Sequence, residues 1–139
     1  MIKILVPIDG SEPALRAVKH AARRAEDGGA EIHLLNVQPT VPIALKGAID
    51  RNTVKRYHQQ EGEMELASAE KLLKRRKVPF KRHIAVGDAA KTIAAYADET
   101  RCDEIVMGAR GMGAMLNLLL GSTTTKVLSL TKLPLTLIR

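Results

Sequence analysis

The sequence predicts one α/β domain, residues 1–139, with five parallel strands in a single sheet and helices on both of its faces. The length of 139 residues is enough for one domain with a sizeable core. Short, nearly continuous apolar runs alternate along the chain with longer segments in which apolar residues recur at helical spacing. That alternation is typical of parallel strands joined by right-handed helical connections, which cover the sheet on both sides.

The first strand and helix lie at the N-terminus. The run Ile2–Ile8 is apolar at most positions, and Pro7 marks its end because proline has no amide hydrogen for the sheet. Ser11 is the predicted N-cap of the following helix. The pair Gly28–Gly29 is predicted to end that helix.

The second unit has an irregular connection and a long helix. A strand is predicted at Ala30–Val37, and the proline-containing segment Gln38–Asp50 predicts an irregular connection. A helix is predicted over Asn52–Lys77. Gly62 is a weak position in it, because glycine costs a helix about 1 kcal/mol relative to alanine.

Three more strands are predicted, at Phe80–Val86, Glu104–Gly108 and Leu133–Ile138. Asp88 is the predicted N-cap of the helix between the first two of them. Before the last strand, a helix is predicted over Ser122–Leu130. The apolar residues at 115–120 that precede it predict a short helical turn packed on the sheet or on a partner.

Composition excludes several classes of function. The only aromatic residues are Tyr57, Phe80 and Tyr96, which argues against proteins that stack single-stranded bases on aromatic platforms. Cys102 is the only cysteine and is expected to be a small buried hydrophobe, so internal disulfides and multi-cysteine metal sites are excluded. No apolar run approaches the length of about 18 residues that a membrane helix needs, and the opening residues do not predict a secretory signal. We therefore expect a cytoplasmic protein that does not contact a membrane.

The net charge of +7 comes from one segment. Lys71–Arg82 contains seven basic residues and no acidic one, and basic and acidic residues are balanced in the rest of the chain. One interpretation is a surface for nucleic acid or another polyanion. The other is a helix C-terminus, whose dipole basic side chains complement. The second is favoured because no nucleic-acid motif accompanies the run, so a nucleic-acid partner is not expected.

Candidate binding residues follow the predicted strand ends. Open α/β sheets bind ligands outside the carboxyl ends of their strands, at the point where the strand order reverses. Asp9 follows the first strand, Val37 ends the second and Gly108 ends the fourth. For Asp9 the alternative is a helix-capping role.

A glycine-rich stretch after the fourth strand predicts an anion site. Its last glycine, Gly121, stands with Ser122 at the start of a helix, and helix N-termini offer unpaired N–H groups and partial positive charge. Glycines let a backbone approach oxygens closely and adopt positive φ. Thr123 adds a hydroxyl and Arg110 a cation. Neither the dinucleotide-binding fingerprint nor a P-loop occurs, and the alternative is that the glycines only mark turns.

The spacing of these glycines resembles the universal stress protein family, whose nucleotide-binding members carry the motif G-2x-G-9x-G-[ST]. Here Gly108 and Gly111 are separated by two residues, and nine residues follow before Gly121-Ser122. The segments Ile4–Glu12 and Pro134–Ile138 are similar to the first and last strands of the family. The resemblance extends over essentially the whole chain.

The resemblance implies a Rossmann-like sheet of strand order 3-2-1-4-5 that binds ATP or a related adenine nucleotide. Mg²⁺ could bridge the phosphates with phosphate and water ligands, since the sequence supplies no set of protein ligands for it. It implies that Pro7 and Asp9 lie beside the adenosine, with Asp9 at the ribose, and that Val37 contacts adenine through its backbone. It places the residues of the glycine motif along the ribose and the phosphates: Gly108, Arg110, Gly111, Gly121, Ser122 and Thr123.

The resemblance further implies a stress-response regulator or sensor with at most slow hydrolysis, and no catalytic or metal-ligating residue is identified. Asp9 and Asp88 are the acids expected near the strand ends, and neither has an obvious base beside it. The alternatives are a true ATPase or phosphotransferase, a nucleotide-free homodimeric interaction module, and polyanion binding through Lys71–Arg82. Because family members commonly dimerise through the last strand, a homodimer through Leu133–Ile138 is expected.

Overall fold

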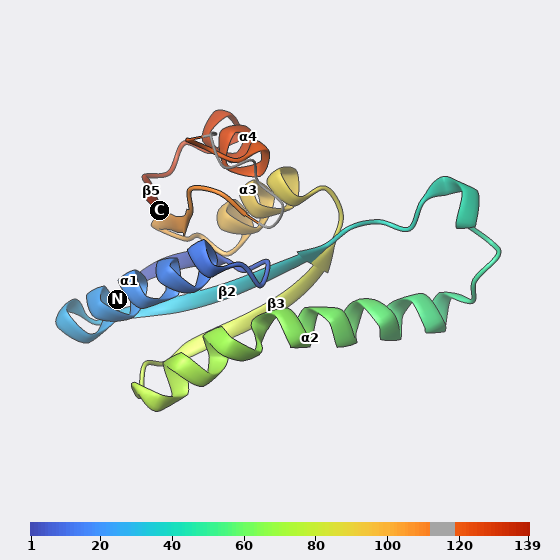
Figure 1. Ribbon diagram of the computed structural model, residues 1–139. Coiled ribbons are helices and arrows are strands. Elements are labelled where there is room, and N and C mark those ends of the chain that lie inside the picture. The colour runs from blue at the N-terminus through green and yellow to red at the C-terminus, as the bar shows by residue number, and fades with distance from the viewer. Residues whose placement is uncertain (112–118) are drawn as a thin grey trace.

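The computed structural model describes residues 1–111 and 119–139, so most of the helical turn predicted at 115–120 lies outside the described residues. Strands and helices alternate along the chain as predicted (Figure 1). The elements are β1 (Ile2–Pro7), α1 (Glu12–Gly28), β2 (Ala30–Gln38), the 3₁₀ helix η1 (Ile43–Leu45), α2 (Arg51–Arg75), β3 (Phe80–Val86), α3 (Ala89–Glu99), β4 (Glu104–Gly108), α4 (Ser122–Leu130) and β5 (Leu135–Ile138).

The five strands form one parallel sheet in the order β3-β2-β1-β4-β5, which confirms the predicted topology. Helices α1 and α2 cover one face, and α3 and α4 cover the other. Central β1 contributes to both core layers, since Ile4 and Val6 face α1 and α2 while Leu5 faces α3. All three side chains are fully buried. The long apolar runs in the sequence thus reflect strands that are covered on both sides.

The predicted helix ends are confirmed where local chemistry defines them. The hydroxyl of Ser11 accepts a hydrogen bond from the amide of Ala14 at 3.3 Å, so Ser11 caps α1. Gly29 ends that helix in the left-handed conformation, with φ of 70°. The carboxylate of Asp88 accepts a hydrogen bond from the amide of Lys91 at 3.0 Å and caps α3.

Gly62, predicted to be a weak position in α2, lies where that helix approaches the sheet most closely among the described glycines of helices. A Cβ atom on Gly62 would lie 2.8 Å from both Cδ1 and Cγ2 of Ile84 on β3. Glycine therefore lets α2 pack directly against the sheet at this point, although it is a poor helix former; its cost to the helix stays a prediction.

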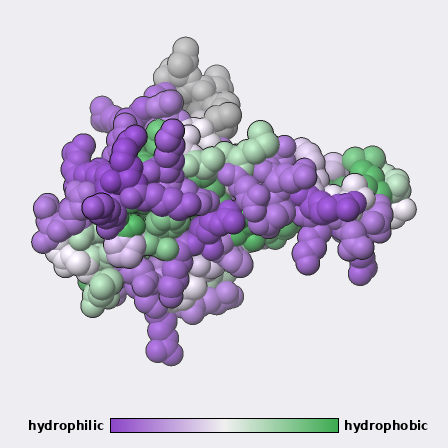
Figure 2. Space-filling model, turned by 90° about the horizontal axis from the view of Figure 1, so that it is seen from below, coloured by the Kyte–Doolittle hydropathy of each residue, from purple (hydrophilic) through white to green (hydrophobic). Residues whose placement is uncertain are grey.

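The N-terminal part of α2 and the connection before it extend beyond the edge of the sheet (Figure 1). Hydrophobic residues lie at the tip of this projection (Figure 2), where Ile43 is 84% exposed. The segment predicted to be irregular, Gln38–Asp50, contains η1 as its one helical turn among the described residues.

Strand β5 begins two residues later than predicted. The amide of Leu133 donates to the hydroxyl of Thr131 at 3.1 Å instead of joining the sheet. Pro134 has no amide hydrogen, although its carbonyl accepts a hydrogen bond from Ile105 on β4 at 3.0 Å. Regular pairing with β4 consequently starts at Leu135.

Candidate functional site

A pocket of about 300 Å³ lies at the carboxyl ends of β1, β2 and β4, next to α3 and the first turn of α4. We call it the strand-end pocket. The structure brings all nine predicted site residues to its wall: Pro7, Asp9, Val37, Gly108, Arg110, Gly111, Gly121, Ser122 and Thr123. They come from four separate parts of the chain, and their role in binding remains a prediction.

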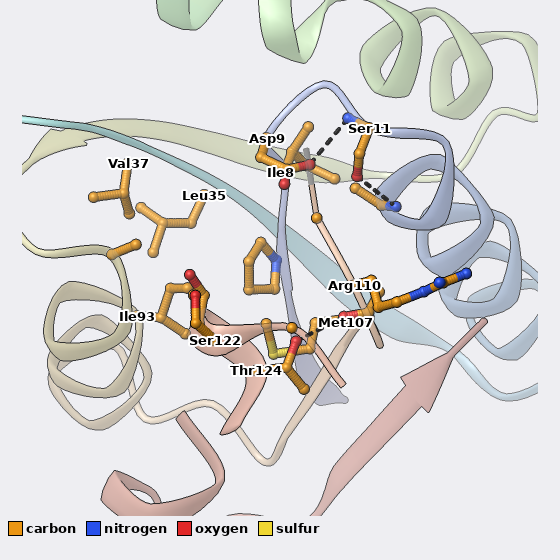
Figure 3. Close-up of a pocket in the computed structure, with 17 residues that line it drawn as sticks. Ile8, Asp9, Ser11, Leu35, Val37, Ile93, Met107, Arg110, Ser122 and Thr124 are labelled. Atoms are coloured by element: carbon orange, nitrogen blue, oxygen red, sulfur yellow. Dashed lines mark hydrogen bonds between the residues drawn. The ribbon is translucent and has the colours of Figure 1, made fainter. Parts of the chain in front are cut away.

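One side of the strand-end pocket is apolar. Leu35 and Val37 of β2, Ile93 of α3 and Met107 of β4 line it together with Pro7 (Figure 3). The sequence analysis did not assign Leu35, Ile93 or Met107 to the site. The signal that could have identified Leu35 and Met107 is the alternation of side chains along a strand, which turns both residues to the α3 side of the sheet. The wall suits a flat apolar group.

The polar side begins in the segment that follows β1, Ile8–Ser11, which we call the Asp9 loop. The amide of Ile8 donates to the carbonyl of Leu35 at 2.8 Å, and Gly10 has a positive φ of 84°. The amide of Ser11 donates to Oδ1 of Asp9 at 2.9 Å (Figure 3). Asp9 thus holds the loop, while Ser11 and not Asp9 is the residue that caps α1.

The motif glycines are explained by close contacts and not by positive φ. Among the described glycines, none of Gly108, Gly111 and Gly121 has a positive φ, so that part of the expectation was wrong. A Cβ on Gly108 would lie 2.8 Å from Cβ of Pro13 and 2.9 Å from its carbonyl carbon. Glycine at this position therefore lets the end of β4 touch the first turn of α1.

The two other motif glycines bring the loops after β1 and β4 together. A Cβ on Gly111 would overlap Oδ2 of Asp9, which passes close to the backbone there. A Cβ on Gly121 would lie 3.3 Å from Cα of Arg110. The amide of Gly121 donates to the carbonyl of Ala109 at 2.8 Å, which ties the start of α4 to the end of β4.

Thr124 locks the first turn of α4 in place and was missed as a site residue. Its hydroxyl donates to the carbonyl of Gly108 at 3.0 Å, and the residue is 2% exposed. The amides of a first helical turn have no carbonyl partner within the helix, so this turn offers hydrogen-bond donors and partial positive charge. Ser122, Thr123 and Thr124 all line the strand-end pocket.

Arg110 lines the strand-end pocket, but its guanidinium group points away from Ser122 (Figure 3). A role as the cation beside a ligand at α4 would require its side chain to turn. Asp9 and Arg110 are the only charged residues among the described residues of the wall.

The structure offers no ready metal centre in the parts of the chain that it describes. No three His, Cys, Asp or Glu side chains gather there in an arrangement that would hold an ion.

The single cysteine, Cys102, is buried, and its burial raises the pKa of its thiol. Within the described ranges, no helix is both long and apolar enough to cross a membrane.

The basic segment lies apart from the strand-end pocket, at the end of α2 and the amino end of β3. Several of its charges are already paired with carboxylates. Arg76 makes two hydrogen bonds to Glu26, at 2.8 and 2.7 Å. Arg82 lies 3.4 Å from Glu63 and 3.3 Å from Glu70. These ion pairs favour the interpretation of Lys71–Arg82 as a charged helix end and edge strand.

Comparison with known families and sequences is consistent with this geometry. The model of the universal stress protein family matches residues 1–139. A universal stress protein of Thermus aquaticus, encoded in the QAH/OAS sulfhydrylase 3′ region, is 33% identical over 137 residues, which cover 98% of this chain and 97% of the relative. Universal stress protein MJ0531 of Methanocaldococcus jannaschii is 29% identical over 140 residues, which cover 99% of this chain and 81% of the relative.

Solved structures share the fold. The hypothetical protein MJ0577 is 28% identical, with a TM-score of 0.85 over 99% of this chain and 94% of that one. The universal stress protein of Archaeoglobus fulgidus, solved in complex with dAMP, is 20% identical, with a TM-score of 0.75 over 100% and 98% of the two chains. A family protein from Arabidopsis thaliana, solved with AMP bound, is 18% identical, with a TM-score of 0.70 over 99% and 91%.

Proposed function

The chain belongs to the universal stress protein family, and from this premise we propose that it binds ATP or a related adenine nucleotide in the strand-end pocket and acts as a stress-response regulator or sensor. The observation that carries the proposal is the meeting of three elements in one pocket: an apolar wall, the carboxylate of Asp9 and the first turn of α4. The Archaeoglobus fulgidus and Arabidopsis thaliana proteins, which share the fold, hold adenine nucleotides. The cytoplasmic location stays a prediction.

The chemistry of the wall matches the parts of such a ligand. The apolar side, formed by Leu35, Val37, Ile93 and Met107, would take the adenine ring, with the backbone of Val37 at its polar edge. Asp9 would accept hydrogen bonds from the ribose hydroxyls. The triphosphate would then run past the glycine motif to the first turn of α4, where backbone amides suit an anion. Side chains larger than glycine would close that path.

Slow hydrolysis at most is proposed because the described wall holds one carboxylate and no second acid or base. Fast phosphoryl transfer needs a group that orients the nucleophile and ligands that place the metal. Oδ1 of Asp9 already accepts the amide of Ser11. If Mg²⁺ accompanies the nucleotide, phosphate oxygens and water would supply most of its ligands.

We also propose that the chain forms a homodimer through β5. The carbonyl of Pro134 accepts a hydrogen bond from Ile105 of β4 at 3.0 Å, and that of Ile138 accepts one from Ala109, the residue after β4, at 2.7 Å. Since the N–H and C=O groups of successive residues in a strand point alternately to its two sides within the sheet, those of Leu135 and Leu137 point away from β4, towards the outer edge of the described sheet. An antiparallel copy of β5 would pair with these groups about a two-fold axis. The opposite edge, β3, carries exposed Lys81 and Arg82, and charged side chains discourage edge pairing.

Calorimetric titration with ATP, with and without Mg²⁺, tests the proposed ligand. We expect saturable binding by the wild type and at least about tenfold weaker binding by Gly121→Val, since its side chain would press on the backbone at Arg110. Gly28→Ala is the matched control, because a Cβ at Gly28 meets nothing within 4 Å. A flat wild-type trace, with no nucleotide found by mass spectrometry in the purified protein, would favour the nucleotide-free interaction module. Multiple-turnover phosphate release that disappears in Asp9→Ala would favour the ATPase.

Light scattering tests the dimer. The wild type is expected at twice the monomer mass at micromolar concentration. Leu137→Pro removes one outward amide hydrogen without removing a bond to β4, so it should give a folded monomer, whereas Leu137→Val should stay dimeric. A monomeric wild type contradicts the proposal.

A further inference from the structure

Two polar side chains are buried at the end of β2, on the face opposite the strand-end pocket. Asn36 is 0% exposed and Gln38 is 4% exposed. They continue the row of Ile32 and Leu34, which pack in the apolar layer under α1 and α2. Polar groups are buried at a cost unless they are hydrogen-bonded, so their partners show what these two residues hold in place.

The partners connect α2 to the Asp9 loop. Nδ2 of Asn36 donates to the carbonyl of Ile8 at 2.9 Å and to Oε2 of Glu65 at 2.6 Å. Nε2 of Gln38 donates to Oδ1 of Asn36 at 2.8 Å. Both hydrogens of the Asn36 amide are therefore used, one on the loop and one on a carboxylate of α2. Bonds to a charged acceptor are shorter and stronger than neutral ones.

Glu65 also limits the next turn of the loop. A Cβ on Gly10 would lie 3.4 Å from Cγ and 3.6 Å from Cβ of Glu65, so the Glu65 side chain faces Gly10 at a distance that would fit one more carbon atom. The loop is thus hydrogen-bonded before Asp9 and bordered by Glu65 after it. Ile8 is bonded through its amide to Leu35 and through its carbonyl to Asn36, whereas Glu65 stands opposite Gly10.

We propose that Glu65, acting through Asn36, is a positioning residue for the carboxylate of Asp9 and so sets how well the pocket discriminates ribose hydroxyls. The inference rests on the proposed nucleotide binding and deepens it. Glu65 and Asn36 do not line the strand-end pocket themselves. Loss of the Glu65 carboxylate leaves one hydrogen of the Asn36 amide without its acceptor and frees the amide to turn from Ile8. The loop then keeps the hydrogen bond between the Ile8 amide and Leu35 but not its bond to Asn36, and the carboxylate of Asp9 is held less firmly at the ribose.

The test compares ATP with 2′,3′-dideoxy-ATP, which lacks both ribose hydroxyls. The wild type should bind ATP about tenfold more tightly than the dideoxy compound, because the hydroxyls donate to a carboxylate. In Glu65→Ala this ratio should fall towards one, with little change in the Kd of the dideoxy compound. Glu65→Gln keeps an oxygen acceptor for Asn36 and should retain most of the ratio. Glu61→Ala removes a glutamate one turn earlier on α2 and should leave the ratio unchanged.

The outcomes separate the two proposals. If the wild type binds neither compound, the proposed function fails. If the wild type discriminates and Glu65→Ala discriminates equally well, the positioning role is wrong while nucleotide binding stands. If Glu65→Ala weakens both compounds equally, the residue has a general structural role and the inference is likewise overturned. Urea unfolding of each variant verifies that the proteins compared are folded.

Discussion

The carboxylate oxygen Oδ2 of Asp9 lies in the space where a side chain on Gly111 would begin. Asp9 follows β1 and Gly111 follows β4, which are neighbours in the sheet. The carboxyl ends of parallel neighbours meet at the same edge, so the two loops compete for the same volume. Glycine at position 111 therefore gives Asp9 its place at the strand-end pocket.

Gly111→Ala should weaken nucleotide binding more than it weakens the fold. The Asp9 side chain can rotate away from the new methyl group, but it then gives up its hydrogen bond with the amide of Ser11. We expect a loss of about 1 kcal/mol in unfolding free energy, measured with urea. We expect at least about a tenfold loss of ATP affinity by calorimetry. A variant that binds ATP as the wild type does would show that the position of Asp9 does not matter for binding.

Gly62→Ala should destabilise the protein even though alanine is the better helix former. The added methyl group would lie 2.8 Å from two atoms of Ile84, and overpacking of this kind costs about 1–3 kcal/mol. Urea unfolding of Gly62→Ala, Ile84→Ala and the double variant forms a double-mutant cycle. The cost of the alanine at position 62 should shrink when Ile84 is already shortened. Stabilisation by Gly62→Ala alone would contradict this expectation and show that helix propensity decides the effect at this position.

Thr124→Val should cost about 1–2 kcal/mol of unfolding free energy and weaken ATP binding. The change leaves the buried carbonyl of Gly108 without its donor and loosens the first turn of α4. Thr124→Ser keeps the hydroxyl and should lose less. Ser129→Ala serves as the control, since its hydroxyl bonds to Lys126 on the exposed side of the same helix. If Thr124→Val and Ser129→Ala changed the unfolding free energy and the ATP affinity equally, the proposed role of Thr124 would be contradicted.

The thiol of Cys102 should react slowly in the native protein. Burial raises the pKa of Cys102, a shift partly opposed by a hydrogen bond with the hydroxyl of Thr100 at 3.3 Å. A raised pKa means that less thiolate is present at pH 8 than in an unfolded chain, and the thiolate is the reactive form. Reaction with a chromogenic disulfide should be slow without denaturant and complete within seconds to minutes in concentrated urea. Equally fast reaction in both conditions would contradict the burial of this side chain.

The positions of the strands and most helix ends could be predicted because local chemistry determines them. Ser11, Gly29 and Asp88 each act within one turn of their own helix, so spacing and residue type were sufficient. Positions that depend on packing between elements were less predictable. The strand β5 began later than expected, since Thr131 takes the amide of Leu133.

The candidate site followed the same division. Strand ends, the glycine motif and the family resemblance together identified nine residues that line one pocket, because each is recognisable by type and by its place in the sequence. Ile93 and Met107 were not assigned from the sequence, where they look like ordinary core residues, and only the side-chain alternation of β4 indicates the side to which Met107 points. They line the pocket because α3 and the carboxyl ends of β2 and β4 border the same space, with β1 between the two strands.

By itself, the sequence determined the parallel α/β sheet and the family and predicted nine residues of the pocket wall, since these depend on periodicity, caps and a spaced motif. The tertiary structure alone decided why the glycines are needed and what supports Asp9. A side chain on Gly108 would clash with Pro13, one on Gly111 with Asp9 and one on Gly62 with Ile84. Asn36 joins β2 to the Asp9 loop and to Glu65. These contacts join residues that are far apart in the chain. The spatial distance between such residues is fixed only when the helices and strands that carry them pack together.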